Sequence, residues 1–150
     1  MATLKSFQAR IRRRARKLPQ LAGNGVDQVA IAVTGALAEG TPKDTTLARS
    51  NWVVQRGSPD LSIRAPRSPA DVVGEAIGKL QGRPTAENEE VHVSNGGDKV
   101  PYLSLLNDGH SEQAPAGFVR AAISVGIGVA RKVRLLTGQS SFTARVTSGE

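Results

Sequence analysis

The GHSEQ segment at 109–113 places a serine beside a histidine, the residue types of a hydrolase nucleophile and its base. A nucleophile elbow follows the pattern G-x-S-x-G, because its strained turn needs a small residue on both sides of the serine. Here Gln113 stands in place of the second glycine, and the only other histidine is His92. A triad also needs an acid and a separate base. We therefore expect no catalytic role for Ser111 or His110, and a loop that precedes a helix.

Two other patterns could bind a ligand. His92, His110 and Asp108 are residue types that bind zinc, but the chain contains no H-x-x-x-H or similar spacing. GEAIGK at 74–79 is one residue short of a phosphate loop, and Leu80 stands where serine or threonine would bind magnesium. With no cysteine, the chain has neither disulfides nor thiolate chemistry. We therefore expect no metal, no cofactor and no enzymatic activity.

The charge of the chain is concentrated at its start. Residues 1–17 contain seven basic side chains and no acidic one, which equals the net charge of +7 of the whole chain. A block of like charge at a terminus is usually an interaction segment, and its partner should be acidic. The cations expected to contact that partner, or DNA, are Arg10, Arg12, Arg13, Arg14, Arg16 and Lys17. Phe7 is the one aromatic residue there, so base stacking is not favoured.

The basic segment and the residues after it have helical periodicity. One apolar stripe recurs at steps of three and four residues, through Leu4, Phe7, Ile11, Ala15 and Leu18. Pro19 is expected to interrupt this helix, and the glycines at 23 and 25 to loosen it further. A second helix is predicted over 26–39, with Gly40 at its end.

Strands are predicted in the middle of the chain. Residues 51–56 and 61–64 indicate two paired strands with a turn at 57–60, and 91–94 indicates another strand. A helix is predicted over 69–80, with Val72, Val73, Ala76, Ile77 and Leu80 on its buried side. Residues 101–107 fit a helical turn or a strand.

A long helix is predicted from Pro115, with a stripe of Phe118, Ala122, Val125, Val129, Val133 and Leu136. Gly126 and Gly128 lie inside it, which indicates close packing or a weak point. The elements together predict an α+β fold: a small, mostly antiparallel sheet packed with a long N-terminal helical region and a C-terminal helix. The expected parts are a basic arm (residues 1–18), an α+β domain (19–136) and a flexible tail (137–150).

Two segments in this order resemble the tail-completion, or neck, proteins of lambdoid phages. TPKDTTLARSNW at 41–52 resembles that family's TP-x-DTG-x-L-x-x-SW stretch, and PYLSLLNDGHSEQAPAGFVRAAI at 101–123 resembles its apYa-x-x-v-E-x-GTs-x-x-x-P-x-x-F-l-x-x-Al stretch. The matching positions with an expected structural role are Thr41, Pro42, Asp44, Leu47, Trp52, Tyr102, Gly109, Pro115 and Phe118. Thr46 departs from the family's glycine, and the helix at 69–80 resembles an insertion.

The resemblance implies a virion structural protein at the head–tail junction, as neck, tail-completion or tail-terminator protein. Such proteins form rings around the DNA channel, for which a six-fold or twelve-fold homo-oligomer is expected. The implied partners are head-closure or adaptor proteins and tail-tube or sheath proteins, with non-specific contact to DNA in the lumen. The implied location is the virion, after synthesis in the cytoplasm of the bacterial host.

A basic nucleic-acid-binding module without a virion role is the alternative. It would bind duplex DNA with an affinity that falls steeply with salt concentration. No stretch approaches the roughly 18 apolar residues of a membrane helix, so no membrane partner is expected.

Overall fold

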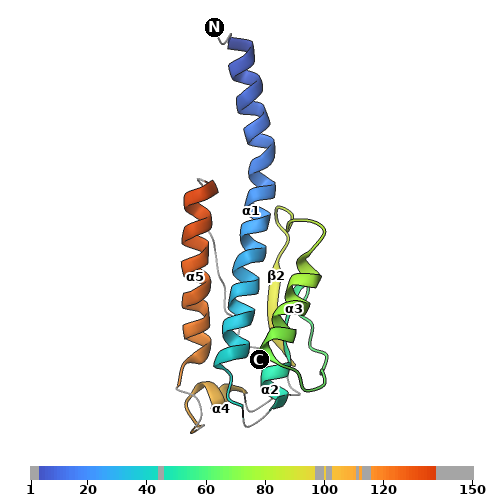
Figure 1. Cartoon of the computed structure of the whole chain (residues 1–150), viewed down its shortest axis with the longest axis vertical. Coiled ribbons are helices and arrows are strands. Elements are labelled where there is room, and N and C mark those ends of the chain that lie inside the picture. Colours follow the sequence, from blue (N-terminus) through green and yellow to red (C-terminus); the bar gives the residue numbers. More distant parts are fainter. Residues whose placement is uncertain are drawn as a thin grey trace.

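The computed structural model describes residues 4–43, 46–96, 100, 103–110, 112 and 116–137. For the helix ends at 4–7 and 134–137 it describes the backbone only. The elements in chain order are α1 (Leu4–Gly40), α2 (Thr46–Ser50), β1 (Trp52–Arg56), α3 (Pro69–Leu80), β2 (Val91–Asn95), α4 (Leu103–Asn107) and α5 (Phe118–Thr137). This confirms the predicted α+β class, with the long helix at the start and another near the end (Figure 1).

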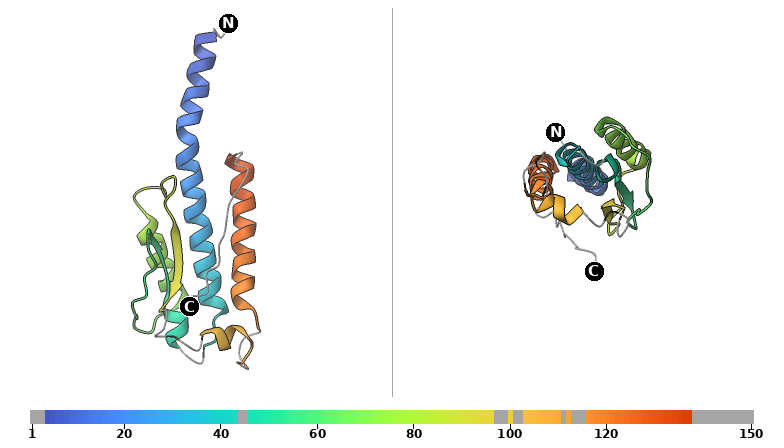
Figure 2. Two further views of the ribbon diagram at one scale, coloured as in Figure 1. Left: turned by 180° about the vertical axis from the view of Figure 1, so that it is seen from behind. Right: turned by 90° about the horizontal axis from the view of Figure 1, so that it is seen from below.

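Helix α1 is the central element of the molecule. It packs against α5 on one side and against α3, β1 and β2 on the other, and α5 and α3 lie on opposite sides of it in both end-on and side views (Figure 2). The first half of α1 projects beyond the other elements (Figure 1). The basic arm and the domain therefore share one continuous helix.

The predicted break at Pro19 is wrong, because α1 runs through it to Gly40. Proline removes one backbone hydrogen bond from the helix, which leaves the carbonyl four residues earlier without its partner. That carbonyl belongs to Ala15, in a turn whose residues are exposed to solvent, where water can satisfy it. Gly23 does not loosen the helix either. A Cβ at this position would overlap the carbonyl oxygen of Thr85, so glycine allows close approach of the 81–90 loop.

Strands β1 and β2 form a two-stranded antiparallel sheet, from the pair Trp52↔Asn95 to the pair Arg56↔Val91. The predicted pairing of 51–56 with 61–64 is therefore wrong, since 61–64 is not a strand. The backbone N–H of Arg64 donates to Oδ1 of Asn51 at 2.6 Å instead of entering a sheet ladder. The short alternation of 61–64 could not show that the partner of β1 lies beyond α3.

The core lies where α1 meets the sheet, α3 and α5. One cluster joins residues from α1, β1, α3 and α5: Leu37, Ala38, Trp52, Val72, Phe118 and Ala122. A second cluster, nearer the arm, consists of Ala30, Val54, Ala76 and Leu80. Because side chains alternate along a strand, Trp52, Val54 and Arg56 all point toward α1, at three successive levels.

Helices α3 and α5 follow the sequence predictions in part. Helix α3 spans the predicted residues and has proline in its first turn, and the structure adds a capping box between Ser68 and Asp71. Val72, Ala76 and Leu80 are buried, but Ile77 is exposed, contrary to the predicted buried side. In α5, Phe118, Ala122 and Val133 are buried as predicted, whereas Val125 is exposed. The predicted tail lies outside the described residues except for Thr137, which ends α5.

Candidate functional site

The described part of the basic arm is exposed along its whole length. Every residue from Gln8 to Leu21 is exposed, so no other described element covers this stretch of α1. All six cations predicted to contact a partner lie on it: Arg10, Arg12, Arg13, Arg14, Arg16 and Lys17. Among the described residues, none of the six takes part in an ion pair. The structure therefore brings these residues together on a projecting rod.

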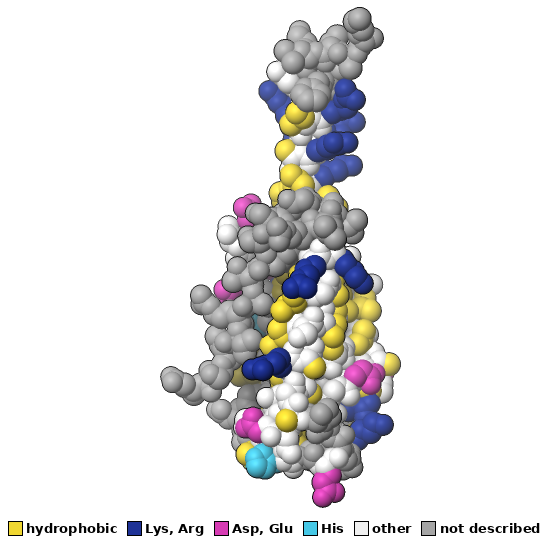
Figure 3. Space-filling model, turned by 90° about the vertical axis from the view of Figure 1, so that its left-hand side faces the viewer, with side chains coloured by type: hydrophobic (Ala, Val, Ile, Leu, Met, Phe, Trp, Pro, Cys, Tyr) yellow, Lys and Arg dark blue, Asp and Glu magenta, His cyan; other side chains and the backbone are white. Residues whose placement is uncertain are grey.

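The arm has two chemically different sides. Ile11, Leu18 and, just past the arm, Leu21 are 51%, 42% and 45% exposed, and their spacing places them near one another on the helix surface. Figure 3 shows apolar side chains along one side of the arm and Lys and Arg side chains along the other. An exposed stripe of large apolar side chains on a helix is the usual contact surface for a second helix or a protein groove.

The cations of the arm repel one another. The pairs Arg10–Arg14, Arg12–Arg16 and Arg13–Lys17 are each four residues apart in α1, where like charges destabilise a helix by about 0.2–0.5 kcal/mol per pair. Anionic groups of a partner would remove this cost. The cavity lined by Gln8, Ala9, Arg12, Arg13 and Arg16 is an open space between the side chains of this single helix, and we do not regard it as a ligand pocket.

A buried ion pair holds α1 at the base of the arm, shortly after the exposed stretch ends. Asp27 of α1 accepts hydrogen bonds from Nη2 of Arg56 at 3.0 Å and from Oγ1 and the backbone N of Thr85 at 2.5 and 3.2 Å. The Asp27 and Arg56 side chains are 10% and 11% exposed. Arg56 also donates to the carbonyl oxygens of Leu80 and Arg83. These bonds join α1, β1 and the 81–90 loop at one point and fix the direction in which the arm projects.

Sequence reasoning missed this ion pair. The sequence pattern places Asp27 inside a predicted helix and Arg56 at the end of a predicted strand, and it marks neither as a site residue. A carboxylate among buried positions of a helix is itself a signal, because a buried charge needs a partner. The sequence alone could not show that the partner lies in β1 and that the 81–90 loop completes the site.

The residues that resemble the phage family occupy structural positions. Nε1 of Trp52 donates to Oγ1 of Thr41 at 2.8 Å, and the Thr41 hydroxyl donates to the carbonyl of Leu37 at 2.6 Å. This contact connects the end of α1 to the start of β1. Pro42 is buried beside Thr41, and the carbonyl of Leu47 accepts a hydrogen bond from the Asn51 amide at 2.6 Å.

The second family-like stretch lies at the start of α5. Phe118 is buried and packs against Gly40, where a Cβ would lie 3.3 Å from that of Phe118. Gly109 has φ of +90°, a conformation that glycine adopts without strain. Asp44, Tyr102 and Pro115 lie outside the described residues.

The candidate chemical residues do not converge in the described part of the chain. His110 and Asp108 are exposed, His92 lies in β2, and Ser111 lies outside the described residues. No group of three or more His, Asp or Glu that could hold a metal occurs among the described residues. The segment that resembles a phosphate loop is part of α3, and its Lys79 pairs with Asp60 and Glu75 at 3.0 and 3.2 Å.

An ion cluster fastens α3 to the 57–68 loop. Asp60 accepts from Arg64 at 2.6 Å, and Glu75 pairs with Arg64 and with Arg67. The hydrogen bond from Arg64, with further bonds from Ser62 and Lys79, holds the pKa of Asp60 far below its usual range. Burial alone would raise the pKa of Glu75, but the hydrogen bonds that it accepts outweigh burial and lower it. Both carboxylates are therefore charged at neutral pH and serve as structural partners.

Comparisons of the chain with protein-family models, with curated proteins and with solved structures found no match. None of the described helices is long and apolar enough to cross a membrane.

Proposed function

We propose that this chain is a bacteriophage virion structural protein at the head–tail junction, where it forms a ring around the DNA channel and allows the tail to join the head. The observation that carries this proposal is the exposed basic arm. It is an ordered helix that projects from the domain and presents a cationic side and an apolar side, which none of the described residues covers. Such a segment suits a subunit of a larger assembly, in which neighbouring proteins cover the arm.

The domain supports the same role through its resemblance to tail-completion proteins. The Thr41–Trp52 hydrogen bond and the packing of Phe118 on Gly40 give the family-like residues a structural role at the C-terminal end of α1, which is the end of the domain far from the arm. The order of elements, with a long helix before the TP segment and another after the phenylalanine, is also the order that the resemblance implies. These residues hold the fold together and do not perform chemistry.

The arm is proposed to dock on the adjoining ring, made of head-closure or adaptor subunits or of tail-tube or sheath subunits. The apolar side chains favour a protein partner, because phosphate backbones offer no apolar surface to Ile11 and Leu18. The cations then pair with carboxylates of that partner. In this arrangement the protein acts in the virion, after synthesis in the host cytoplasm.

The test uses a phage or inducible lysogen in which codon 52 is a stop, examined by electron microscopy. We expect filled heads beside unjoined tails. Wild-type protein supplied in trans should restore joining, and protein lacking residues 2–17 should not, although its Trp52 fluorescence reports a folded domain. Complete, joined particles in the stop mutant would contradict the junction role.

Two arm variants separate charge from side-chain type. Substitution of Arg12, Arg13 and Arg16 by glutamine should reduce joining, and the matched lysine variant, which keeps the charge, should retain most of it. Ile11→Ser with Leu18→Ser should also reduce joining, because these substitutions remove the apolar side of the arm.

A basic nucleic-acid-binding module is the second candidate, favoured by the six cations of the arm, which form no ion pair with any residue that the structure describes. It predicts duplex DNA binding whose logarithm falls by about 0.9 per log unit of salt for each phosphate neutralised. It also predicts that the serine variants leave binding intact, since phosphates need only the cations. Loss of function in the serine variants with unchanged DNA binding would favour the docking role.

A further inference from the structure

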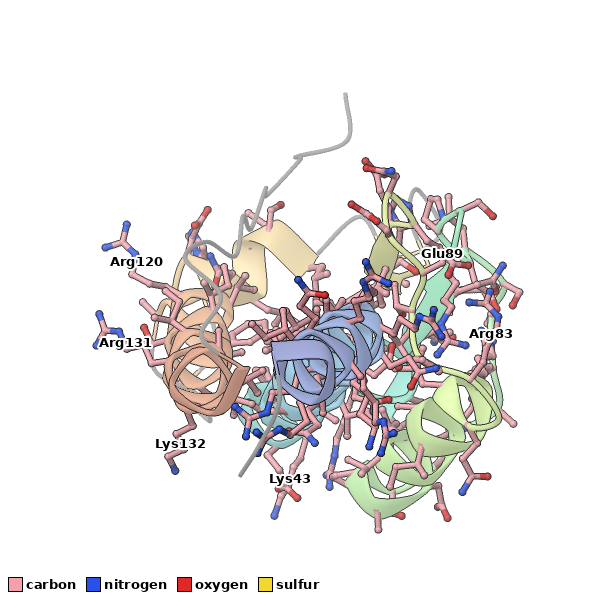
Figure 4. All side chains as sticks on the ribbon, turned by 90° about the horizontal axis from the view of Figure 1, so that it is seen from above. Lys43, Arg83, Glu89, Arg120, Arg131 and Lys132 are labelled. Carbon is pink, nitrogen blue, oxygen red and sulfur yellow. The ribbon has the colours of Figure 1, made fainter. Side chains whose placement is uncertain are left out.

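Helix α5 presents a cationic and apolar face away from the domain. Arg120, Val125, Ile127, Arg131 and Lys132 are all exposed, and α5 contains no acidic residue. None of its described cations takes part in an ion pair among the described residues. Figure 4 shows the Arg120 and Arg131 side chains directed away from α1.

The opposite side of the molecule has the complementary character. Helix α3 exposes Asp71 and Ile77, and the 81–90 loop that follows it exposes Glu87 and Glu90. The other two acidic residues of α3 and this loop have partners within the chain: Glu89 pairs with Arg83 (Figure 4), and Glu75 pairs with Arg64, Arg67 and Lys79. Among exposed charges that have no oppositely charged Lys, Arg, Asp or Glu partner in the described chain, the α5 side is therefore cationic and the α3 side anionic, and both sides also expose large apolar side chains.

The two sides also match in height along α1. Both α3 and α5 run antiparallel to α1: Val73 lies beside Gly35, Phe118 beside Gly40, and Gly126 beside Val33. We call the position of a residue along the α1 axis its level. Since each helical residue advances about 1.5 Å, these contacts set the level of every other residue on the two helices.

Charged and apolar side chains on the α3 side lie at the same levels as complementary side chains on the α5 side. Asp71 lies level with Arg120, and Ile77 lies level with Ile127. The 81–90 loop touches α1 at Gly23 through Thr85, close to the level of Arg131 and Lys132. A rotation about an axis parallel to α1 leaves all these levels unchanged. Repeated copies related by such a rotation would therefore bring opposite charges and apolar groups together.

Three helical glycines fit the same arrangement. Gly74 and Gly78 of α3 and Gly128 of α5 have no atom within 4 Å of the position that a Cβ would occupy, unlike Gly126, whose Cβ would overlap Val33. Glycine is unfavourable in a helix interior, and no contact within the described chain explains it at these three positions. Gly78 lies level with Gly128, where the absence of side chains would allow two helices to approach closely.

We propose that the outer face of α5 in one copy packs against α3 and the 81–90 loop of the next copy, in a heterologous interface that closes into a ring about an axis parallel to α1. A head-to-tail interface of this kind generates a ring when the rotation closes. The inference rests on the proposed function for the role of the ring, and it adds which surfaces build it. DNA bound to the cationic face of α5 would be the competing occupant, but Val125 and Ile127 favour a protein surface.

The absence of native cysteine allows a direct test by cross-linking. The full chain is prepared as Gly78→Cys, as Gly128→Cys and as the double variant, and each is treated with a short bismaleimide. We expect the two single variants to remain uncross-linked when alone and to form dimers when mixed, and the double variant to give a ladder of oligomers. An uncross-linked double variant, or single variants that cross-link equally well alone, would overturn the interface.

Charge reversal gives an independent test that does not depend on cross-linker geometry. Arg131→Glu with Lys132→Glu should weaken self-association at least ten-fold in sedimentation experiments, and so should Glu87→Lys with Glu90→Lys. An equimolar mixture of the two should recover heterologous dimers. The second variant keeps the wild-type α5 face, the first keeps the wild-type α3 side, and these two surfaces can pair. Lys43→Glu, at an exposed cation outside both faces, is the control and should change nothing.

The same variants distinguish the possible failures. If reversal at 131 and 132 lowers binding to a duplex DNA probe and leaves self-association unchanged, the α5 face binds DNA and the interface is wrong. If cross-linking fails and the codon-52 stop still leaves unjoined heads and tails, the interface is wrong and the proposed function stands. If the ladder forms and the stop mutant makes complete particles, the interface stands without the junction role.

Discussion

Removal of the Asp27 carboxylate should destabilise the domain more than any change on the arm. In Asp27→Ala, Arg56 would remain buried, with its side chain 11% exposed, and would lose its only anionic partner among the described residues. Removing one member of a buried ion pair costs about 3–5 kcal/mol. The Arg56 guanidinium keeps the carbonyls of Leu80 and Arg83 and the hydroxyl of Thr85 as acceptors, so we expect a loss near 3 kcal/mol.

The measurement is urea unfolding followed by the fluorescence of Trp52, the single tryptophan, at one protein concentration. A shift of the midpoint without a change in slope would mean that stability changed and the unfolded state did not. Asp27→Asn keeps the shape and part of the hydrogen bonding, so its loss should be smaller than that of Asp27→Ala.

The double variant with Arg56→Met is the control, because it removes the buried charge that Asp27→Ala leaves behind. Its loss should be less than the sum of the two single losses by about 0.5–3 kcal/mol. If Asp27→Ala unfolds within about 0.5 kcal/mol of the wild type, which is the range of ordinary surface substitutions, the ion pair does not hold the base of the arm and the reasoning is wrong.

Three further predictions concern other parts of the domain. Gly126→Ala should lower the free energy of unfolding by about 1–2 kcal/mol through overpacking, whereas Gly128→Ala should raise that of the isolated subunit by up to about 1 kcal/mol; denaturant titration of both at low concentration checks the opposite signs, and equal effects would contradict the assigned packing. Trp52→Phe should lower the free energy of unfolding by about 1–3 kcal/mol, because it leaves a space in the core and removes the donor to the buried Thr41 hydroxyl. Thermal unfolding followed by circular dichroism measures this loss, and an unchanged transition would contradict a structural role for the Trp52–Thr41 hydrogen bond. The pKa values of Asp60 and Glu75 are lowered in the folded state, so their contribution to stability is present above about pH 4 and is lost as the pH falls below it; stability curves of the wild type and of Asp60→Asn with Glu75→Gln should converge in acid, and parallel curves would argue against the cluster.

Local patterns predicted those elements whose causes are local. The helix at 69–80 follows from Pro69 and the apolar spacing after it, and the capping box of Ser68 and Asp71 that the structure adds is also a local feature. The burial of Phe118 likewise follows from its place at the head of an apolar stripe.

Features that depend on distant contacts could not be predicted. Gly23 reads as a helix breaker until the 81–90 loop is placed against it, and Leu61–Arg64 reads as a strand until β2 occupies the place beside β1. For the candidate site, the arm's cations were found from charge alone. Asp27, which sets the direction of the arm, was missed because its partners are about thirty and sixty residues away in the chain.

The continuity of α1 has a mechanical consequence. A helix of 37 residues is about 55 Å long, and roughly the first half of it stands free of the domain while the remainder is packed on both sides. Such a rod works as a lever. A rotation of the domain by a few degrees sweeps the free end through distances comparable to an atomic diameter, and a load applied at the tip is delivered as torque to the contacts around Asp27 and Gly126. A movement of the domain would thereby displace the tip, and binding at the tip would transmit force to the core.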